Sequence, residues 1–401
     1  MLKLSSEHQA LFGLIKTALG RQDETEYDNN INWYEVRSES LKQSVFLIAL
    51  DAVKKSSLSD DVKAIWTYIE QRNVLKNIRS FYAISETDRF MRKNNFRYVI
   101  LKGIAAAYYY PNYFLRMLGD VDFLIDSKYR GEVEKTLKSA GYRNLNIDNT
   151  CHSVFKKPGQ NLEMHFDIPG IPYGIPGDYV REYISGVLDE CIHFEVDGSV
   201  IEIPQPKYHA LIILLHMEKH MLSEGIGLRH LMDFACFIDK TAGDRFWENN
   251  LLPILKRIGL YKYAQVMAKT GAMYFGTTCP DWAICADEEL CDDIMQDILT
   301  GGNFGRKNSA RSDSGIIISQ GGKNGTKRST ICNLCHAFRS VVRVHFPIVK
   351  KNPLLYPIFD IATVFRWIWL VLTGKRHSLF VRFKYAGKRK SVYERLEIFE
   401  I

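Results

Sequence analysis

The feature that most constrains this chain is an Asp-Val-Asp segment, Asp120 to Asp122, at the start of the apolar run Val121 to Ile125. A short apolar run of this kind is typical of a buried strand. Side chains alternate along a strand, so the two aspartates share one face of it. Because neighbouring carboxylates repel each other, a cation between them is the usual compensation. The segment therefore predicts a strand that starts at a divalent-metal site, with an ordinary solvated strand start as the alternative.

A second apolar run, Tyr98 to Leu101, lies upstream and predicts another buried strand. Lys102 and Gly103 end this run, and the glycine permits a sharp turn. Ile104 to Tyr110 follows as the expected start of a helix, whose free N–H groups can face an anion. The predicted order is a strand, a Lys-Gly turn, a helix and the acidic strand.

This order resembles the nucleotidyltransferases of the polymerase-β superfamily, in which a glycine turn precedes a metal-binding Asp-x-Asp. A narrower family of uncharacterised bacterial nucleotidyltransferases, with an LKG…YP…R…DxD pattern, is similar over about residues 93 to 239. The elements that carry the resemblance are Leu101-Lys102-Gly103, Tyr110-Pro111, Leu115-Arg116 and Gly119-Asp120-Val121-Asp122. The chain departs from many superfamily members, which have Gly-Ser at the turn and a shorter gap to the acids.

The resemblance implies a third metal-binding carboxylate on a later strand, and Glu163 in the expected strand Leu162 to Phe166 is the candidate. Alternation places Glu163, His165 and Asp167 on one face of that strand. Asp167 is the rival third acid, but it lies about 13 Å from Glu163 along a strand, so only one of them can complete the site. His165 is expected either to contact substrate or to make a structural hydrogen bond.

The predicted catalytic set is Asp120, Asp122 and Glu163, holding Mg²⁺ or Mn²⁺. The predicted substrate-binding residues are Lys102, Gly103, Arg116 and His165. Lys102 and Arg116 are chosen because they are the nearest cations for phosphate, the alternative being two solvated surface charges.

The activity implied by the resemblance is a nucleotidyl transfer, of the EC 2.7.7 type, from a nucleoside triphosphate to an acceptor hydroxyl. The acceptor class, whether sugar, small molecule, protein or tRNA, depends on loops that a sequence does not place. Two other functions stay open: a non-catalytic nucleotide- or RNA-binding regulator, and a membrane-surface scaffold in polysaccharide or natural-product assembly.

We predict an α+β fold in which a small mixed-sheet core is flanked by helical regions. Its 401 residues, 46% of them hydrophobic, are enough for more than one buried core. Hydrophobic periodicity and composition divide the chain into five parts. These are an N-terminal helical region (1–94), the nucleotidyltransferase core (95–203), a helical domain (204–300), a flexible linker (301–330) and a basic helical tail (331–401).

Positive charge is concentrated at the C-terminal end. Residues 303–401 contain nineteen Lys and Arg against five Asp and Glu, or +14, whereas the rest of the chain carries −7. This asymmetry favours nucleic acid or an anionic membrane surface as a partner, with a solvated basic face as the alternative. Leu354 to Leu372 is apolar, but Asp360 and Arg366 would each cost about 2.5–3.5 kcal/mol near the centre of a spanning helix. We therefore expect a buried or interfacial helix there. Met1 to Arg21 resembles no signal sequence, so we expect a cytoplasmic protein that can associate with a membrane.

Overall fold

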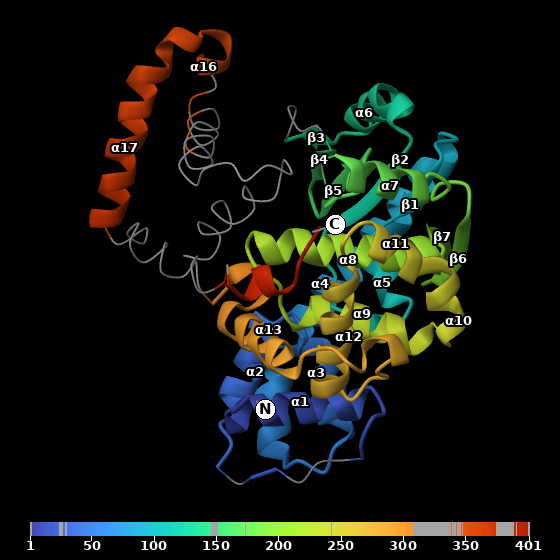
Figure 1. Cartoon of the computed structure of the whole chain (residues 1–401), viewed down its shortest axis with the longest axis vertical. Helices are drawn as coiled ribbons and strands as arrows, with labels where there is room; N and C mark the ends of the chain where they lie inside the picture. The colour runs from blue at the N-terminus through green and yellow to red at the C-terminus, as the bar shows by residue number, and fades with distance from the viewer. Residues whose placement is uncertain are drawn as a thin grey trace.

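The computed structural model describes most of the chain up to Lys307 and two segments near its end. The described residues are 2–23, 27–28, 30–145, 151–172, 174–241, 243–307, 338, 342, 346, 348–373, 389 and 391–399. They form helices around a mixed five-stranded sheet (Figure 1), which confirms the predicted α+β fold. Most of the expected linker and the basic segment Gly374 to Lys390 lie outside the described residues.

Four helices precede the sheet: α1 (Ser6–Ala18), α2 (Trp33–Lys42), α3 (Phe46–Lys55) and α4 (Asp60–Lys93). Helix α4 is the longest, at 34 residues, and Ser59 caps its first turn by accepting a hydrogen bond from the Val62 N–H. It delivers the chain to the first strand and packs beside β2 and β5.

The main sheet has the strand order β1-β2-β5-β4-β3. Its strands are β1 (Tyr98–Ile100), β2 (Val121–Ile125), β3 (Arg143–Asn144), β4 (His152–Lys157) and β5 (Gln160–His165). Strands β2 and β5 run parallel, while the other neighbours are antiparallel. The sequence therefore located β1, β2 and β5 correctly to within two residues at each end.

Short helical elements connect these strands: α5 (Ile104–Ala107), η1 (Tyr113–Leu115), η2 (Ser127–Tyr129), α6 (Arg130–Ser139) and α7 (Ile175–Tyr183). A hairpin of β6 (Cys191–Val196) and β7 (Ser199–Pro204) follows. The alternating runs on either side of Asp197-Gly198 predict this hairpin, but the expectation that it completes the main sheet is wrong. Strand β7 packs beside β1, but its strand partner is β6, so the hairpin is a separate two-stranded sheet.

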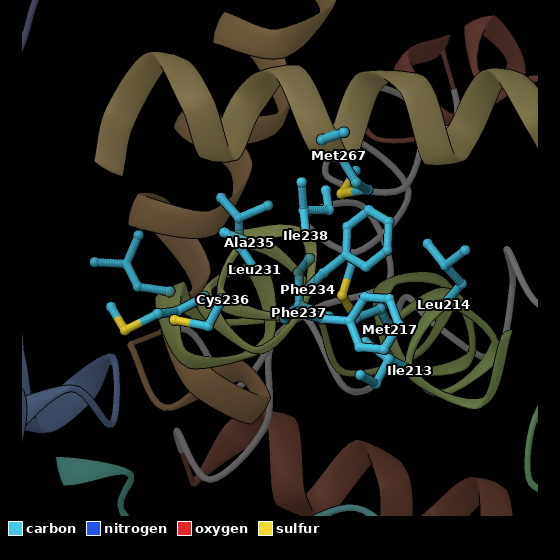
Figure 2. Close-up of a cluster of buried hydrophobic side chains, with 14 of the residues drawn as sticks. Ile213, Leu214, Met217, Leu231, Phe234, Ala235, Cys236, Phe237, Ile238 and Met267 are labelled. Carbon is cyan, nitrogen blue, oxygen red and sulfur yellow. The ribbon is translucent and has the colours of Figure 1, made fainter. Parts of the chain in front are cut away.

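A helical unit covers the sheet and shares an apolar core with the N-terminal helices α1 and α3. Its elements are α8 (Pro206–Leu222), α9 (Leu228–Lys240), α10 (Asp244–Phe246), η3 (Trp247–Leu251), α11 (Leu252–Arg257), α12 (Tyr261–Phe275), η4 (Asp281–Ala283), α13 (Glu288–Gly301) and η5 (Asn303–Gly305). Figure 2 shows side chains such as Leu214, Met217, Phe234, Phe237 and Met267 meeting between α8, α9 and α12. Burying each such side chain contributes about 1.5–3 kcal/mol, so this core fixes α8 and α9 against each other.

The remaining described elements are α16 (Ile348–Lys351), η6 (Pro353–Leu355) and α17 (Tyr356–Leu372), which is drawn in orange in Figure 1. Judged by length and apolar content, none of the helices in the described part of the chain would reach across a bilayer. The predicted division into five parts stays a prediction.

Candidate functional site

The register of the central strands brings two of the predicted acids together. Strands β2 and β5 are parallel neighbours, and Asp122 is the direct partner of Glu163 in their ladder. Both side chains therefore lie on the same face of the sheet. The Leu101 N–H donates to the Asp122 carbonyl at 2.9 Å, which joins the end of β1 to the same point. Asp120 lies just before β2, and it is exposed to solvent.

The rival acid Asp167 lies elsewhere. It follows β5 and accepts hydrogen bonds from the Ile168 N–H at 2.9 Å and from Arg181 at 3.5 Å. Together with Ile125 and Asp126 it lines a cavity of about 710 Å³ at the far end of β2. The structure thus groups Glu163, and not Asp167, with Asp122.

Lys102 is the counterion of the acids. Lys102 and Gly103 have φ of 34° and 47°, in the left-handed region, and the turn that they form brings the Lys102 Nζ to 2.6 Å from Asp122 Oδ1. A non-glycine residue there costs about 1–2 kcal/mol, which the ion pair offsets. Burial opposes the lysine charge, but Asp122 and Glu163 outweigh it and raise the pKa of Lys102. Lys102, which the sequence predicts to bind phosphate, therefore pairs with these carboxylates instead.

Two histidines complete the cluster. His165 is fully buried, and its Nε2 lies 2.9 Å from Asp122 Oδ1 and 3.8 Å from Glu163 Oε2. His152 Nε2 lies 3.0 Å from Glu163 Oε1. Burial and the nearby Lys102 ammonium lower the pKa of His165 to about 4. Sequence reasoning missed His152, although it lies opposite His165 in the antiparallel ladder of β4 and β5.

The environment separates the pKa values of the carboxyl groups. Burial opposes ionisation of Asp122, but the Lys102 ammonium and the His165 hydrogen bond hold the pKa of Asp122 below its usual range. Burial and the Asp122 carboxylate raise the pKa of Glu163 to about 8, and the two groups share a hydrogen bond. The surrounding protein atoms and Asp122 also raise the pKa of Asp120. Glu163 therefore keeps a proton near neutral pH. A cation bound there would likewise relieve the repulsion between the Asp122 and Glu163 carboxylates.

Arg116, predicted to bind phosphate, is instead part of a buried ion pair. It is 5% exposed, and its Nε and Nη2 donate to the two carboxylate oxygens of Asp233 at 2.8 and 2.7 Å. The Tyr110 hydroxyl donates to the same carboxylate at 2.8 Å. This bidentate pair fixes the loop before β2 to α9.

Helix α4 holds the same loop from the other side. The Asn77 side-chain amide donates to the carbonyls of Phe114 and Arg116 at 3.0 and 3.1 Å, and its oxygen accepts from the Leu118 N–H at 2.7 Å. The Ser80 hydroxyl donates to the Gly119 carbonyl at 3.0 Å. These bonds satisfy buried backbone groups and so set the position of Asp120, which directly follows the loop.

A group of cations that the sequence reasoning missed lies beside Asp120. Its members, here called the cation cluster, are Arg72 and Lys76 of α4, Arg229 of α9 and Arg306 after η5. Partial burial and the neighbouring Arg306 and Arg229 lower the pKa of Lys76, while Asp120 acts in the opposite direction. Burial, Arg116 and Arg306 lower the pKa of Arg229 to about 10. The Arg229 charge in turn opposes the upward shift in the pKa of Asp120. Lys76 and Arg229 therefore interact electrostatically with Asp120.

In the part of the chain that the structure describes, no carboxylate lies within ion-pair distance of these cations, although Asp233 interacts electrostatically with Arg229. Within the described ranges none of the four forms an ion pair, and the buried Nε of Arg229 has no hydrogen-bond partner. Gly227 permits the close approach of α9 and η5, because a Cβ there would lie 2.7 Å from Asn303. Such like charges are unfavourable until an anion joins them. One sequence signal was available: Arg72 and Lys76 lie four residues apart, on one face of a helix.

Two overlapping sets of donor atoms could hold a metal. Asp120, Asp122 and Glu163 offer the hard oxygen ligands that Mg²⁺ prefers. With Lys102 beside them, the three ionised acids keep two negative charges, which suits one divalent ion. Among the described residues, one group of three or more candidate ligands has all its donor atoms within 4.8 Å of one another: His152, Glu163 and His165.

The chain matches the family model described as "Uncharacterised nucleotidyltransferase" over residues 29–276, and it belongs to that family. This confirms the predicted nucleotidyltransferase assignment; restriction of the family to bacteria stays a prediction. Among solved structures, an antigenic nucleotidyltransferase-like protein from Paracoccidioides brasiliensis is similar, with 14% identity and a TM-score of 0.31. The likeness covers 46% of this chain and 91% of that chain. No curated protein matches the sequence.

Proposed function

We propose that this chain transfers a nucleoside monophosphate from a nucleoside triphosphate to an acceptor hydroxyl and releases pyrophosphate. The observation that carries the proposal is that Asp122 pairs with Glu163, and that the neighbouring Asp120 interacts electrostatically with Arg229, a cation that forms no ion pair among the described residues. Acids alone would suit a metal site, and cations alone would suit any anion. The combination suits a metal-bound polyphosphate, and membership of a nucleotidyltransferase family supports it.

In this proposal the cation cluster binds the phosphate tail. Lys76 and Arg229 interact electrostatically with Asp120, and Arg306 with both of these cations, so together they would stabilise negative charge on the departing pyrophosphate. Arginine suits this role because its planar guanidinium donates two parallel hydrogen bonds to phosphate oxygens.

Asp120, Asp122 and Glu163 would hold Mg²⁺ or Mn²⁺, which neutralises the triphosphate and polarises the α-phosphate when bound. Lys102 keeps Asp122 ionised and holds its orientation. Without a metal Glu163 holds a proton near neutral pH, so metal binding would have to displace that proton before the Glu163 carboxylate could act as a ligand and promote attack by the acceptor hydroxyl.

The acceptor and the nucleotide base are left open in this proposal. A non-catalytic nucleotide- or RNA-binding regulator is the alternative, and the retained pairing of Asp122 with Glu163 and Lys102 favours the enzyme.

The test is a transfer assay with the full chain. Purified protein is incubated with Mg²⁺, each triphosphate radiolabelled at its α-phosphate, and fractions of a cell lysate. We expect a labelled acceptor that disappears with Asp122→Asn. Asp126→Asn, at the opposite end of β2, is the matched control and should retain labelling. Equal labelling by Asp122→Asn would contradict the proposal, as would the absence of any labelled fraction together with metal-independent triphosphate binding.

We also propose that α17 associates with an anionic membrane surface, on the cytoplasmic side. The helix exposes apolar side chains at three- and four-residue spacing, Ile358, Ile361, Phe365 and Trp369, and Leu354 of η6 extends this stripe. On another face, Phe359 stacks on Phe346 with ring centroids 4.5 Å apart. The sequence that follows, Gly374 to Lys390, carries seven Lys or Arg and no acid. An exposed apolar stripe next to a basic segment is typical of an interfacial helix.

Flotation with liposomes tests the membrane proposal. The chain should float with vesicles that contain phosphatidylserine, and Phe365→Glu with Trp369→Glu should abolish flotation. Arg366→Gln, on the same helix, should leave it largely intact. Binding to RNA with no binding to vesicles would replace lipid by nucleic acid as the partner.

A further inference from the structure

The cleft contains a set of nitrogen donors that a magnesium site does not require. His152 Nε2 lies 3.0 Å from Glu163 Oε1, and His165 Nε2 lies 3.8 Å from Glu163 Oε2. Asp122 Oδ1 lies 2.9 Å from His165 Nε2. In a tetrahedral site with metal–ligand bonds of about 2.1 Å, neighbouring ligand atoms are about 3.4 Å apart. The three donor–donor distances given above, 3.0, 3.8 and 2.9 Å, are each within about 0.5 Å of this spacing.

We infer that His152, Glu163 and His165 form a binding site for a transition-metal ion such as Mn²⁺ or Zn²⁺, with Asp122 hydrogen-bonded to His165 beside it. Imidazole nitrogens suit Zn²⁺ best; Mn²⁺, which prefers oxygen ligands, binds imidazole more readily than Mg²⁺ does when carboxylates are also present. The inference adds a metal position to the cleft of the proposed function, and it rests on that function only for its link to transfer.

The positions of these side chains are fixed by the sheet and not by flexible loops. His152 and His165 are direct partners in the antiparallel ladder of β4 and β5, and Glu163 is the partner of Asp122 in the parallel ladder of β2 and β5. His165 is completely buried, and the side chains of His152 and Glu163 are 17% and 20% exposed. Ligands on adjacent strands are preorganised, so little entropy is lost when an ion binds.

Charge and protons are consistent with this site. Asp122 and Glu163 carry two negative charges when ionised, and Lys102 balances one of them. Without a metal, hydrogen atoms must lie between the close donor pairs His152–Glu163 and His165–Asp122. A metal ion would take their place, so binding should release protons to the solvent.

His152 is the residue to substitute in a test, because the proposed transfer does not require it. It is also more accessible than His165, the other imidazole of the site. The chain is freed of metal with a chelator, and Mn²⁺ and Mg²⁺ are titrated separately by calorimetry without nucleotide. Bound Mn²⁺ is also examined by pulsed electron paramagnetic resonance, which detects a coordinated nitrogen directly. His193→Ala, on the exposed face of β6, is the matched control.

We expect Mn²⁺ to bind with nitrogen coupling from imidazole. His152→Ala should weaken Mn²⁺ binding by about tenfold or more, since even outer-shell partners of a ligand contribute 10- to 100-fold. Mg²⁺ affinity should change far less, and His193→Ala should behave as the unsubstituted chain does. The spectrum of the unsubstituted chain is decisive even if His152→Ala fails to fold, which circular dichroism would detect.

Absence of nitrogen coupling, or an unchanged Mn²⁺ affinity in a folded His152→Ala variant, would overturn the site. The result is separable from the proposed function. Labelled acceptor without nitrogen coupling overturns the metal site and leaves nucleotidyl transfer standing. Nitrogen coupling that depends on His152 supports the site even if no acceptor is labelled.

Discussion

Arg116 and Arg229 should have opposite roles, although the sequence offers both as cations near the acids. Arg116 is buried in a bidentate pair with Asp233, whereas Arg229 has no ion pair within the described residues. We therefore expect Arg116→Met to reduce stability and Arg229→Met to reduce nucleotide affinity. Methionine keeps much of the side-chain volume, so the comparison isolates the charge.

The size of each effect follows from the partners. Removing Arg116 leaves the buried Asp233 without its bidentate partner, with only the Tyr110 hydroxyl bond and the more distant Arg229 charge to stabilise it, which should lower the free energy of unfolding by about 3–5 kcal/mol. Removing Arg229 breaks one hydrogen bond, to the Met117 carbonyl at 3.3 Å, and relieves repulsion from Arg306. The free energy of unfolding of Arg229→Met should change by less than about 1 kcal/mol. The variant loses a charge-assisted hydrogen bond to phosphate worth about 1.5–3 kcal/mol, so triphosphate binding should weaken about 10- to 100-fold.

Urea unfolding followed by circular dichroism measures stability, and calorimetry with Mg²⁺ and each triphosphate measures affinity. Affinity for Arg116→Met is determined at a temperature where the variant is folded. Asp233→Asn in both backgrounds completes a double-mutant cycle, which should assign a large coupling energy to Arg116 and a smaller one to Arg229, whose charge also interacts with Asp233. The reasoning fails if Arg116→Met is stable but does not bind triphosphate, or if Arg229→Met binds as tightly as the unsubstituted chain.

Three further predictions concern the acids. Glu163→Gln should abolish transfer with a normal circular dichroism spectrum, and Asp167→Asn should remain active; the reverse result would make Asp167 the third carboxylate. Triphosphate should bind only with Mg²⁺ or Mn²⁺, so equal calorimetric binding after chelation would refute the metal assignment. Because the folded chain holds the Glu163 proton up to about pH 8 but the unfolded chain releases it near pH 4.5, this group's contribution to stability should be lost as pH rises between those values. Urea unfolding of Glu163→Gln should show a weaker loss over that window, and an identical pH profile would contradict the pKa.

Local patterns in the sequence were sufficient for the strands and for the face on which each acid lies. The two-residue period of a strand fixes that Asp120 and Asp122 share a side, and that Glu163 and His165 share a side, whatever the rest of the chain does. Linked motifs were likewise sufficient for the nucleotidyltransferase family, and the α+β class followed from the mixture of apolar runs and helical periodicity.

Only the tertiary structure decided which charged groups meet. The partner of Lys102 depends on the left-handed turn and on the register of β2, and the partner of Arg116 lies 117 residues away on α9. His152 entered the site through the pairing of β4 with β5, and the cation cluster gathers residues from α4, α9 and the segment after η5. Helical and strand periods determine which way a side chain points relative to its own element. Contacts between distant elements depend instead on how their apolar faces pack, and this is a property of the whole core.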